Sequence, residues 1–355
     1  MELESKALEE YNKHVKRRVF FLIFMTMAII ISAMISISFG SVKIPIRDVV
    51  STLFTQGDGI SEVIIWNIRL SRVLTAIVAG MGLAVSGTAM QSILRNPIGS
   101  PFTLGTSHAS AFGAAFAIVI LGAGSHQSAF SDAVYVNNIH IITISAFLFS
   151  LISTCVIIFL ARVKGASPET MILTGVAIGS LFIAGTTAIE YFANDVQLSS
   201  IIFWTFGDVG RSSWQELSVM SAIVLPALIY FTYNSWNYNA LDAGEETAKS
   251  LGVNVERVRI VGLLIASLVT ALIVSFVGII GFVGLVVPHI VRKAIGGDER
   301  FMMVGSILCG ALLLLLSDTM ARLVIAPVVL PVGILTSFLG APLFIFLVVK
   351  GRDYW

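Results

Sequence analysis

Long uninterrupted runs of apolar residues alternate with short polar segments along the whole chain. The runs lack the strict apolar–polar alternation of β-barrel strands, and lipid admits no other spanning structure than a helix. A spanning helix needs about 20 predominantly apolar residues. The pattern therefore predicts an all-α integral membrane protein with about ten transmembrane helices. The runs are Val19–Phe39, Leu70–Ile93, Thr103–Gly122, Ile141–Ala161, Met171–Tyr191, Leu217–Tyr233, Ile260–Ile279, Phe282–Ile295, Phe301–Leu323 and Val332–Val349.

The composition agrees with this pattern. Of the 355 residues, 56% are hydrophobic and only 12% are charged, whereas an average soluble domain has about 25% charged residues. So little charge cannot cover a water-exposed surface of this size, which excludes a soluble enzyme and a disordered chain. The net charge of +1 shows no polyelectrolyte bias, so we expect membrane lipid and no nucleic acid among the partners.

Basic residues give the expected orientation. The polar segment 1–18 ends in a cluster of lysines and arginines, and the apolar run after it is too long for a cleavable signal peptide. The positive-inside rule then places this segment in the cytoplasm. We expect a transmembrane domain over residues 19–349 with a cytoplasmic loop at 234–259, and a cytoplasmic tail at 350–355. Both termini of this multi-pass protein of the cytoplasmic membrane would be cytoplasmic.

Neither catalytic residues nor metal ligands stand out. The chain contains no HExxH, GxSxG or Walker lysine motif, and its two cysteines lie inside apolar runs. If ATP drives this protein, another chain binds it. An ion-coupled secondary transporter stays open as the alternative, although such a carrier usually keeps ionisable groups in mid-membrane and few are present here.

Three arginines, Arg69, Arg72 and Arg322, depart from the charge trend because they fall on the external side. They can be interfacial anchors whose side chains reach the headgroups, or a docking site for an acidic partner. Arg322 also follows Asp318 by four residues, which favours a local ion pair.

The most informative polar segment is Leu241–Gly252, which reads LDAGEETAKSLG. Gly244 interrupts the chain, the residues after it favour a short helix, and Gly252 suits its C-terminal end. A short capped helix on a cytoplasmic loop can fill the groove of a partner protein. An ordinary solvated loop helix has the same spacing.

Several longer strings resemble one family. The chain is similar to the permease subunit of the ABC importers for iron–siderophores, haem and cobalamin, from about residue 37 to residue 352. The strings are NIRLSRVLTAIVAG from Asn67, GTAMQSILRNPIGSPFTLGTSHAS from Gly87, LDAGEETAKSLGV from Leu241, GIIGFVGLVVPHIVR from Gly278 and LPVGILTSFLGAPLFIFL from Leu330. The resemblance implies the type II ABC importer permease fold.

This resemblance also implies partners and a substrate class. It implies a second permease protomer, with a homodimer as the default and a heterodimer still open. Two cytosolic ATPase subunits would carry ATP and Mg, so this chain itself would hold no cofactor. An external binding protein would deliver an iron chelate, haem or cobalamin, and the sequence does not choose among these.

Three groups of site residues follow from the resemblance. The arginine trio becomes a binding-protein docking site. The turn between the fourth and fifth spans becomes a cytoplasmic gate at Ser167, Pro168 and Glu169, where Pro168 and Glu169 depart from the small polar residues usual in the family and Glu169 can equally be a helix N-terminal acid. The ATPase-coupling residues are Asp242, Gly244, Glu245, Glu246, Ala248 and Gly252.

Overall fold

The computed structural model describes the backbone of residues 2–40, 44–54, 59–123, 126–127, 134–135, 138–163, 167–326 and 328–350. Every predicted apolar run coincides with a helix, which confirms the all-α membrane fold. These helices are α1 (Glu2–Ser38), α4 (Ser71–Leu94), α5 (Thr106–Val119), α6 (Ile139–Val163), α7 (Pro168–Phe192), α9 (Trp214–Tyr233), α12 (Val255–Val277), α13 (Val283–Ile295), α14 (Glu299–Leu323) and α15 (Val332–Lys350). Within the residues that the structure describes, seven helices are long and apolar enough to cross a membrane, and α5 and most of α15 form shorter apolar helices.

The polar segments contain elements that the apolar pattern does not predict. They are α2 (Ile46–Phe54), α3 (Ile60–Val63), the π-helix η1 (Ile64–Leu70), the antiparallel strands β1 (His126–Gln127) and β2 (Val134–Tyr135), α8 (Asp195–Thr205), the 3-10 helix η2 (Val209–Arg211), α10 (Ser235–Asp242) and α11 (Glu245–Ser250). Helix α1 also runs without interruption from Glu2 into the first apolar run, and the cytoplasmic location of residues 1–18 stays a prediction.

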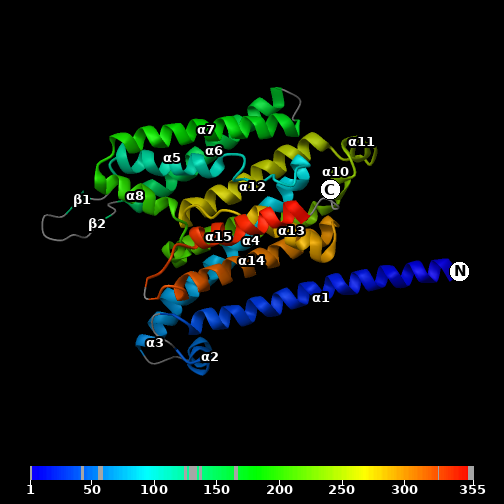
Figure 1. The fold of residues 1–355 in the computed structure, drawn as a ribbon, viewed down its shortest axis with the longest axis horizontal. Helices are drawn as coiled ribbons and strands as arrows, with labels where there is room; N and C mark the ends of the chain where they lie inside the picture. Colours follow the sequence, from blue (N-terminus) through cyan, green and yellow to red (C-terminus); the bar gives the residue numbers. More distant parts are fainter. Residues whose placement is uncertain are drawn as a thin grey trace.

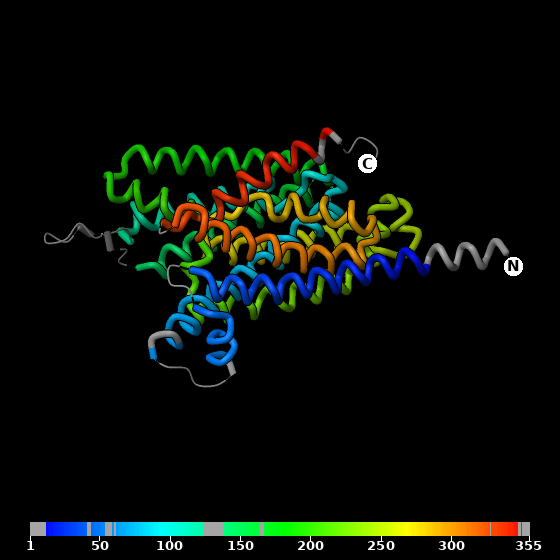
Figure 2. The backbone as a smooth tube through the Cα atoms, turned by 60° about the horizontal axis from the view of Figure 1, so that its bottom comes forward, coloured from blue at the N-terminus to red at the C-terminus, as the bar shows by residue number. Residues whose placement is uncertain are grey.

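The helices run roughly parallel to one long axis, and the polar elements gather at its two ends (Figure 1). Helices α10 and α11 lie at the end where α1 begins, whereas α3 and the β1–β2 hairpin lie toward the opposite end. Figure 2 shows the same arrangement from another side, with α1 along the edge of the bundle. The loop predicted to couple to an ATPase is thus far from the arginine-bearing end.

The core of the bundle is built from α4, α12 and α14, whose apolar windows are largely buried, while α1 and α7 are mostly exposed. Glycines let the core helices approach at backbone distance. A Cβ atom added at Gly80 of α4 would lie 2.3 Å from the carbonyl oxygen of Gly310 in α14, and one added at Gly87 would overlap the Gly284 carbonyl of α13. Membrane helices pack through such small residues because lipid supplies no hydrophobic drive for association.

The chain also breaks its helices inside the bundle. Gly278 and Phe282 have positive φ angles of 78° and 66° and turn the chain from α12 into α13. The freed backbone groups find partners in other breaks: the amide of Asp208 donates to the Val277 carbonyl over 2.8 Å, and the amide of Gly333 donates to the Gly207 carbonyl over 3.0 Å. Irregular backbone is tolerated at such depth only where protein or a cavity satisfies it.

Candidate functional site

Helix α11 is a short, sharply framed helix at one end of the bundle. Gly244 precedes it with a φ of 118°, and Gly252 follows it with a φ of 82°. The amide of Gly252 donates to the Lys249 carbonyl and that of Val253 donates to the Ala248 carbonyl, each over 3.0 Å. This pair of bonds is the Schellman motif, in which glycine is favoured at the left-handed position. The predicted short helix and its glycine end are therefore confirmed as structure.

One face of α11 is anchored and the other is open. Ala248 is completely buried against the core, whereas Glu246 and the residues that follow Ala248 on the helix are exposed. Glu245 forms ion pairs of 3.0 Å with Lys249 of the same helix and with Arg259 of α12. The hydrogen bond from Lys249 lowers the pKa of Glu245, and the charge of Arg259 adds to this effect. The buried Arg259 thus fixes the root of a helix whose outer face is free for a partner.

Helix α10 holds α11 to the rest of the bundle through the turn before α14. Asp298 caps α14 and accepts hydrogen bonds from Asn239 of α10 over 3.2 Å and from Arg18 of α1 over 3.2 Å. Arg300 pairs with the same carboxylate over 2.6 Å and stacks on the ring of Trp236, 4.5 Å from its centroid. The hydrogen bonds from Arg300 and Asn239 lower the pKa of Asp298 to about 2. This carboxylate therefore joins three helices at the α11 end.

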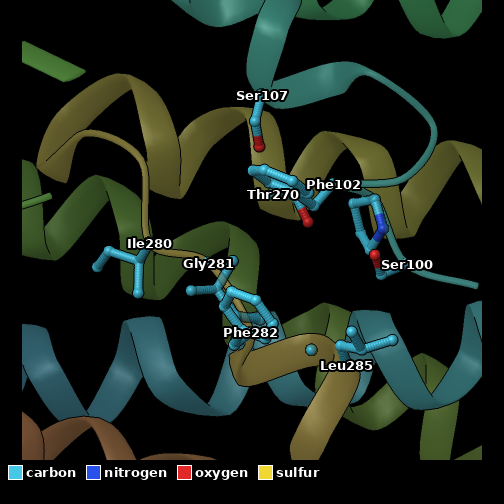
Figure 3. Close-up of a pocket in the computed structure, with 11 residues that line it drawn as sticks. Ser100, Phe102, Ser107, Thr270, Ile280, Gly281, Phe282 and Leu285 are labelled. Carbon is cyan, nitrogen blue, oxygen red and sulfur yellow. The ribbon is translucent and has the colours of Figure 1, made fainter. Parts of the chain in front are cut away.

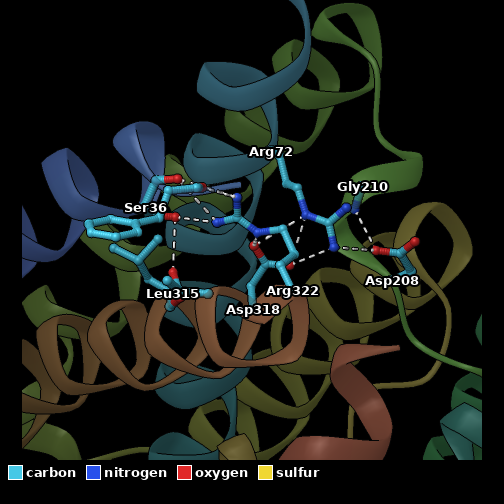
Figure 4. Close-up of polar contacts among 9 residues, drawn as sticks. Ser36, Arg72, Asp208, Gly210, Leu315, Asp318 and Arg322 are labelled. Carbon is cyan, nitrogen blue, oxygen red and sulfur yellow. Dashed lines mark hydrogen bonds and ion pairs between the residues drawn. The ribbon is translucent and has the colours of Figure 1, made fainter. Parts of the chain in front are cut away.

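The opposite end contains a second ionic cluster, shown in Figure 4. Asp318 of α14 is fully buried and accepts hydrogen bonds from Arg72 of α4, with its shortest contact at 2.8 Å, and from Arg322 over 3.1 Å. Arg72 also pairs with Asp208 over 3.0 Å. Arg322 also donates a hydrogen bond to the Ser36 hydroxyl of α1 over 2.5 Å. The predicted local ion pair between Asp318 and Arg322 is confirmed.

The side chains of the three arginines are buried. Arg69 is 5% exposed and donates to the carbonyls of Ile37 and Ser38, over 2.6 and 3.1 Å, at the end of α1. The side chains of Arg72 and Arg322 are 14% and 9% exposed. Burial of a guanidinium is costly unless it is paired, and internal acceptors from distant parts of the chain supply that pairing here. A docking role for the trio stays a prediction.

The expected gate residues lie at the start of α7, at the α11 end of the bundle. Ser167 caps the helix by accepting a hydrogen bond from the Thr170 amide over 3.3 Å, Pro168 occupies its first turn and Glu169 is an acidic residue of that turn. This arrangement is the ordinary start of a helix. A gating role for Ser167, Pro168 and Glu169 has no test in the structure, and the preceding residues 164–166 lie outside the described part.

Two cavities lie beside the interrupted helices in the middle of the bundle. The larger, of about 320 Å³, is lined by residues from the segments that meet there, including Phe206, Gly207, Ile279 and Gly333. The smaller, of about 60 Å³, is bounded by Ser100, Phe102, Thr270 and Phe282 (Figure 3). A space of about 60 Å³ holds waters rather than a chelate. Neither cavity is a formed substrate site, although both mark where the bundle is hollow.

Sequence reasoning missed Asp208 and Asp298, which organise the two ionic clusters. Each aspartate directly follows a glycine and precedes a helical turn whose first amides it caps. An aspartate at that position is an N-cap signal that the sequence does contain. The spacing along the sequence does not indicate that these two aspartates pair with distant arginines.

Comparison with known proteins decides the family. Residues 28–350 match the model of the FecCD transport family. The chain belongs to the FecCD transport family. It is 36% identical over 338 residues to the hemin transport system permease protein HmuU of Yersinia pestis, which covers 93% of this chain and 95% of that one. It is 35% identical over 300 residues to the vitamin B12 import system permease protein BtuC of Vibrio cholerae, with 84% and 87% covered.

Two further relatives agree with this assignment. An ABC transporter permease protein of Methanocaldococcus jannaschii is 53% identical over 342 residues, covering 96% of this chain and 97% of that one. A solved metal-chelate type ABC transporter in an inward-facing conformation superposes with a TM-score of 0.80 at 31% identity, covering 93% and 98% of the two chains. This FecCD chain is therefore a multi-pass permease subunit of an ABC importer and not an enzyme. Members of the family work with separate ATPase subunits and a binding protein, and nothing supports the alternative of an ion-coupled carrier.

Proposed function

We propose that this permease imports an iron chelate, haem or a cobalamin, and that α11 is the segment through which cytosolic ATPase subunits drive it. The observation that carries the coupling role is the construction of α11: an exposed helix, framed by two glycines in left-handed conformations and rooted in the core through Ala248 and the Glu245–Arg259 pair. A partner that moves this helix must also move α12, which begins at Val255.

The shape beside α11 supports a protein partner. A cleft of about 340 Å³ lies between α11 and the start of α12 and is lined by charged and amide side chains, among them Lys249, Asn254 and Glu256. Leu251 adds an apolar side chain that is 68% exposed at the tip. An exposed apolar anchor within a polar rim is the usual composition of a protein–protein contact. In this proposal α11, the gate residues and both termini lie on the cytoplasmic side.

The substrate class rests on the relatives. Proteins named for hemin, vitamin B12 and Fe(3+)-citrate import are each 30% or more identical over most of this chain. All three names describe a transition metal held by an organic ligand. We therefore propose an organic chelate of a transition metal, carried between two protomers; the two cavities described above are too small or too open to enclose a haem or a cobalamin.

The exposed face of α7 supports a second copy of the chain as that other protomer. Ser180 and Thr187 are exposed on a helix that is otherwise strongly apolar. The Ser180 hydroxyl donates to the Val176 carbonyl of its own helix over 2.9 Å, and such small hydroxyl-bearing residues are enriched where membrane helices contact one another. We propose a homodimer in which α7 faces the partner across the pathway, with Ser167, Pro168 and Glu169 at its cytoplasmic mouth.

Docking of the binding protein is proposed at the opposite end, near Arg69, Arg72 and Arg322. The buried state of these side chains adds a condition to the proposal. An acidic partner has to compete with Asp318 and Asp208 for the guanidinium groups, so docking would rearrange the cluster rather than simply neutralise free charges.

The coupling role is tested with a paired replacement in the complete transporter, reconstituted in proteoliposomes with its ATPase and binding protein. Glu246→Lys with Gly252→Pro reverses an exposed charge and removes the left-handed turn, and we expect loss of ATP-driven uptake at unchanged membrane insertion. The control, Glu246→Asp with Gly252→Asn, keeps the charge and a residue that tolerates this conformation, and should transport normally. Full uptake by the first variant would refute the coupling role.

The same proteoliposomes test the substrate class. Ferric citrate, hemin and cyanocobalamin are offered in turn with the binding protein, and we expect ATP-dependent accumulation of one of them. Accumulation of a free metal ion instead, with none of the three chelates carried, would overturn the proposal.

A further inference from the structure

A buried carboxylate lies where α10 meets the start of α14. Glu299 is the first residue of α14, and its side chain is 0% exposed. One oxygen, Oε1, is 3.4 Å from Nη2 of Arg292 in α13. The other, Oε2, is buried and accepts no hydrogen bond from any residue within the described part of the chain. A buried oxygen without a donor is costly, so this atom requires an explanation.

The carboxyl group that contacts Glu299 belongs to Asp242, the last residue of α10. Asp242 lies at the rim of the bundle, and its Oδ2 is 3.5 Å from the buried hydroxyl of Ser92 in α4. Desolvation raises the pKa of Asp242, despite the opposing charges of Arg292 and Arg95. Tyr238 of α10 lies near enough for the charge of Glu299 to act on its phenol. The Ser92 hydroxyl also interacts with the carboxyl of Glu299.

Two arginines, Arg292 and Arg95, act on the pair through their charges, but direct ion pairing is weak if both carboxyls are ionised. Among the described residues, the one ion pair made by either carboxyl is that of Glu299 with Arg292, and at 3.4 Å it is loose. The nearby Asp298 offers no relief, since its carboxylate is already engaged by Arg18, Arg300 and Asn239. Two carboxylates in contact in a partly desolvated site do not both ionise readily, and one proton shared between them is the usual solution. The shared proton would also provide Oε2 of Glu299 with its missing donor.

We propose that Asp242 and Glu299 share one proton and act as a positioning pair that holds α10, and with it α11, against the start of α14. This inference rests on the coupling role proposed for α11. Only Ala243 and Gly244 separate Asp242 from the first residue of α11. Because this link is short, a displacement of the end of α10 passes to α11. When the proton leaves to solvent through the exposed side of Asp242, two negative charges meet and the end of α10 is pushed outward.

The direction of the pH effect follows from this proton. The docked arrangement binds one proton more than the released arrangement does, so rising pH favours release and falling pH favours docking. Replacement of Glu299 by Gln removes one of the two charges and supplies a permanent N–H donor at the same place. We expect the Glu299→Gln variant to keep α10 docked at all pH values at which the wild type titrates.

The experiment uses the full transporter in nanodiscs and two readouts that do not depend on transport. Infrared spectroscopy detects a protonated carboxyl group through its carbonyl band, which we expect near neutral pH in the wild type and not in Glu299→Gln, because the exposed Asp242 then ionises beside Arg292 and Arg95. A spin label at Lys249→Cys reports the mobility of α11. Its mobility should rise with pH in the wild type and be constant in Glu299→Gln.

The control is Glu246→Gln, which removes an exposed carboxyl from α11 itself and should keep the wild-type band and the wild-type pH profile. An identical pH profile in Glu299→Gln and the wild type, or the absence of the carboxyl band from the wild type, would overturn the proton-sharing pair. Failure of the coupling role gives a different result: the band and the mobility change are present, but the spin label is unaffected when the ATPase subunits bind and uptake does not depend on α11.

Discussion

Asp318 offers the sharpest test of the ionic cluster at the arginine-bearing end. Asp318→Asn keeps the shape of the side chain and removes its charge. In the structure this residue is completely buried between Arg72 and Arg322, whose side chains are 14% and 9% exposed. Removing one partner of a buried ionic group leaves uncompensated charge in a poorly solvated place, which costs about 3–5 kcal/mol. Asp208 still contacts Arg72 and Ser36 still contacts Arg322, so we expect the lower end of that range, about 3 kcal/mol.

The chain contains a matched control with the same spacing. Glu245 and Lys249 also form an i,i+4 ion pair, at 3.0 Å, but their side chains are 39% and 62% exposed. An exposed pair of this kind contributes about 0.2–1 kcal/mol, so Lys249→Gln should barely change stability. Unfolding of the purified permease is followed by circular dichroism in mixed micelles of increasing SDS fraction. Equal losses in the two variants would refute the conclusion that burial determines the strength of the arginine cluster.

Three further outcomes follow from the structure. Gly80→Ala places a Cβ 2.3 Å from the Gly310 carbonyl oxygen and should cost about 1–3 kcal/mol in the same unfolding assay, whereas Gly297→Ala, where a Cβ would meet no atom within 4 Å, should not. Asp298→Asn keeps a good N-cap but loses the charge. Because the pKa of Asp298 is lowered to about 2, its contribution is full above its unfolded value of about 3.9 and disappears as pH falls through about 2. The variant should therefore be less stable than the wild type at neutral pH, by about 1–2 kcal/mol. As the pH falls from about 3.9 to about 2, the variant should lose less stability than the wild type does. Ser167→Cys in both protomers should form a disulfide in one state of the ATP cycle, and no cross-link in any state would remove the gate assignment.

The apolar pattern predicts the large helices well because burial in lipid requires each of them to satisfy its own backbone. The same pattern cannot predict α8, since its residues Asp195–Thr205 lie in a segment that mixes polar and apolar positions without a long run. Residues 2–18 form helix for a related reason: continuation from an established helix adds residues without a new nucleation step. The apolar run alone therefore does not show where α1 begins.

Helix α11 was predictable and the arginine cluster was not. Gly244, the acidic first turn and Gly252 are local signals for a short helix, and they act within a few residues of one another. Arg72 meets Asp208 across 136 residues of sequence and Asp318 across 246. Spacing along the chain contains no information on such contacts, and an arginine at a span end is equally compatible with solvent, lipid headgroups or an internal carboxylate. Only the tertiary arrangement distinguishes these possibilities.

Helices α4 and α14 connect the two ends of the molecule. Helix α4 contributes Arg72 to one ionic cluster and Ser92 to the carboxyl pair at the other end, and α14 contributes Asp318 and Glu299 in the same way. Between the clusters the two backbones are in contact at Gly80. Such close-packed interiors have low compressibility and transmit displacement. A push on α11 that reaches the start of α14 would therefore move the arginine cluster as part of the same rigid pair. The Gly80→Ala variant tests this directly: if it separates the helices yet leaves ATP-driven uptake unchanged, the two ends communicate by another route.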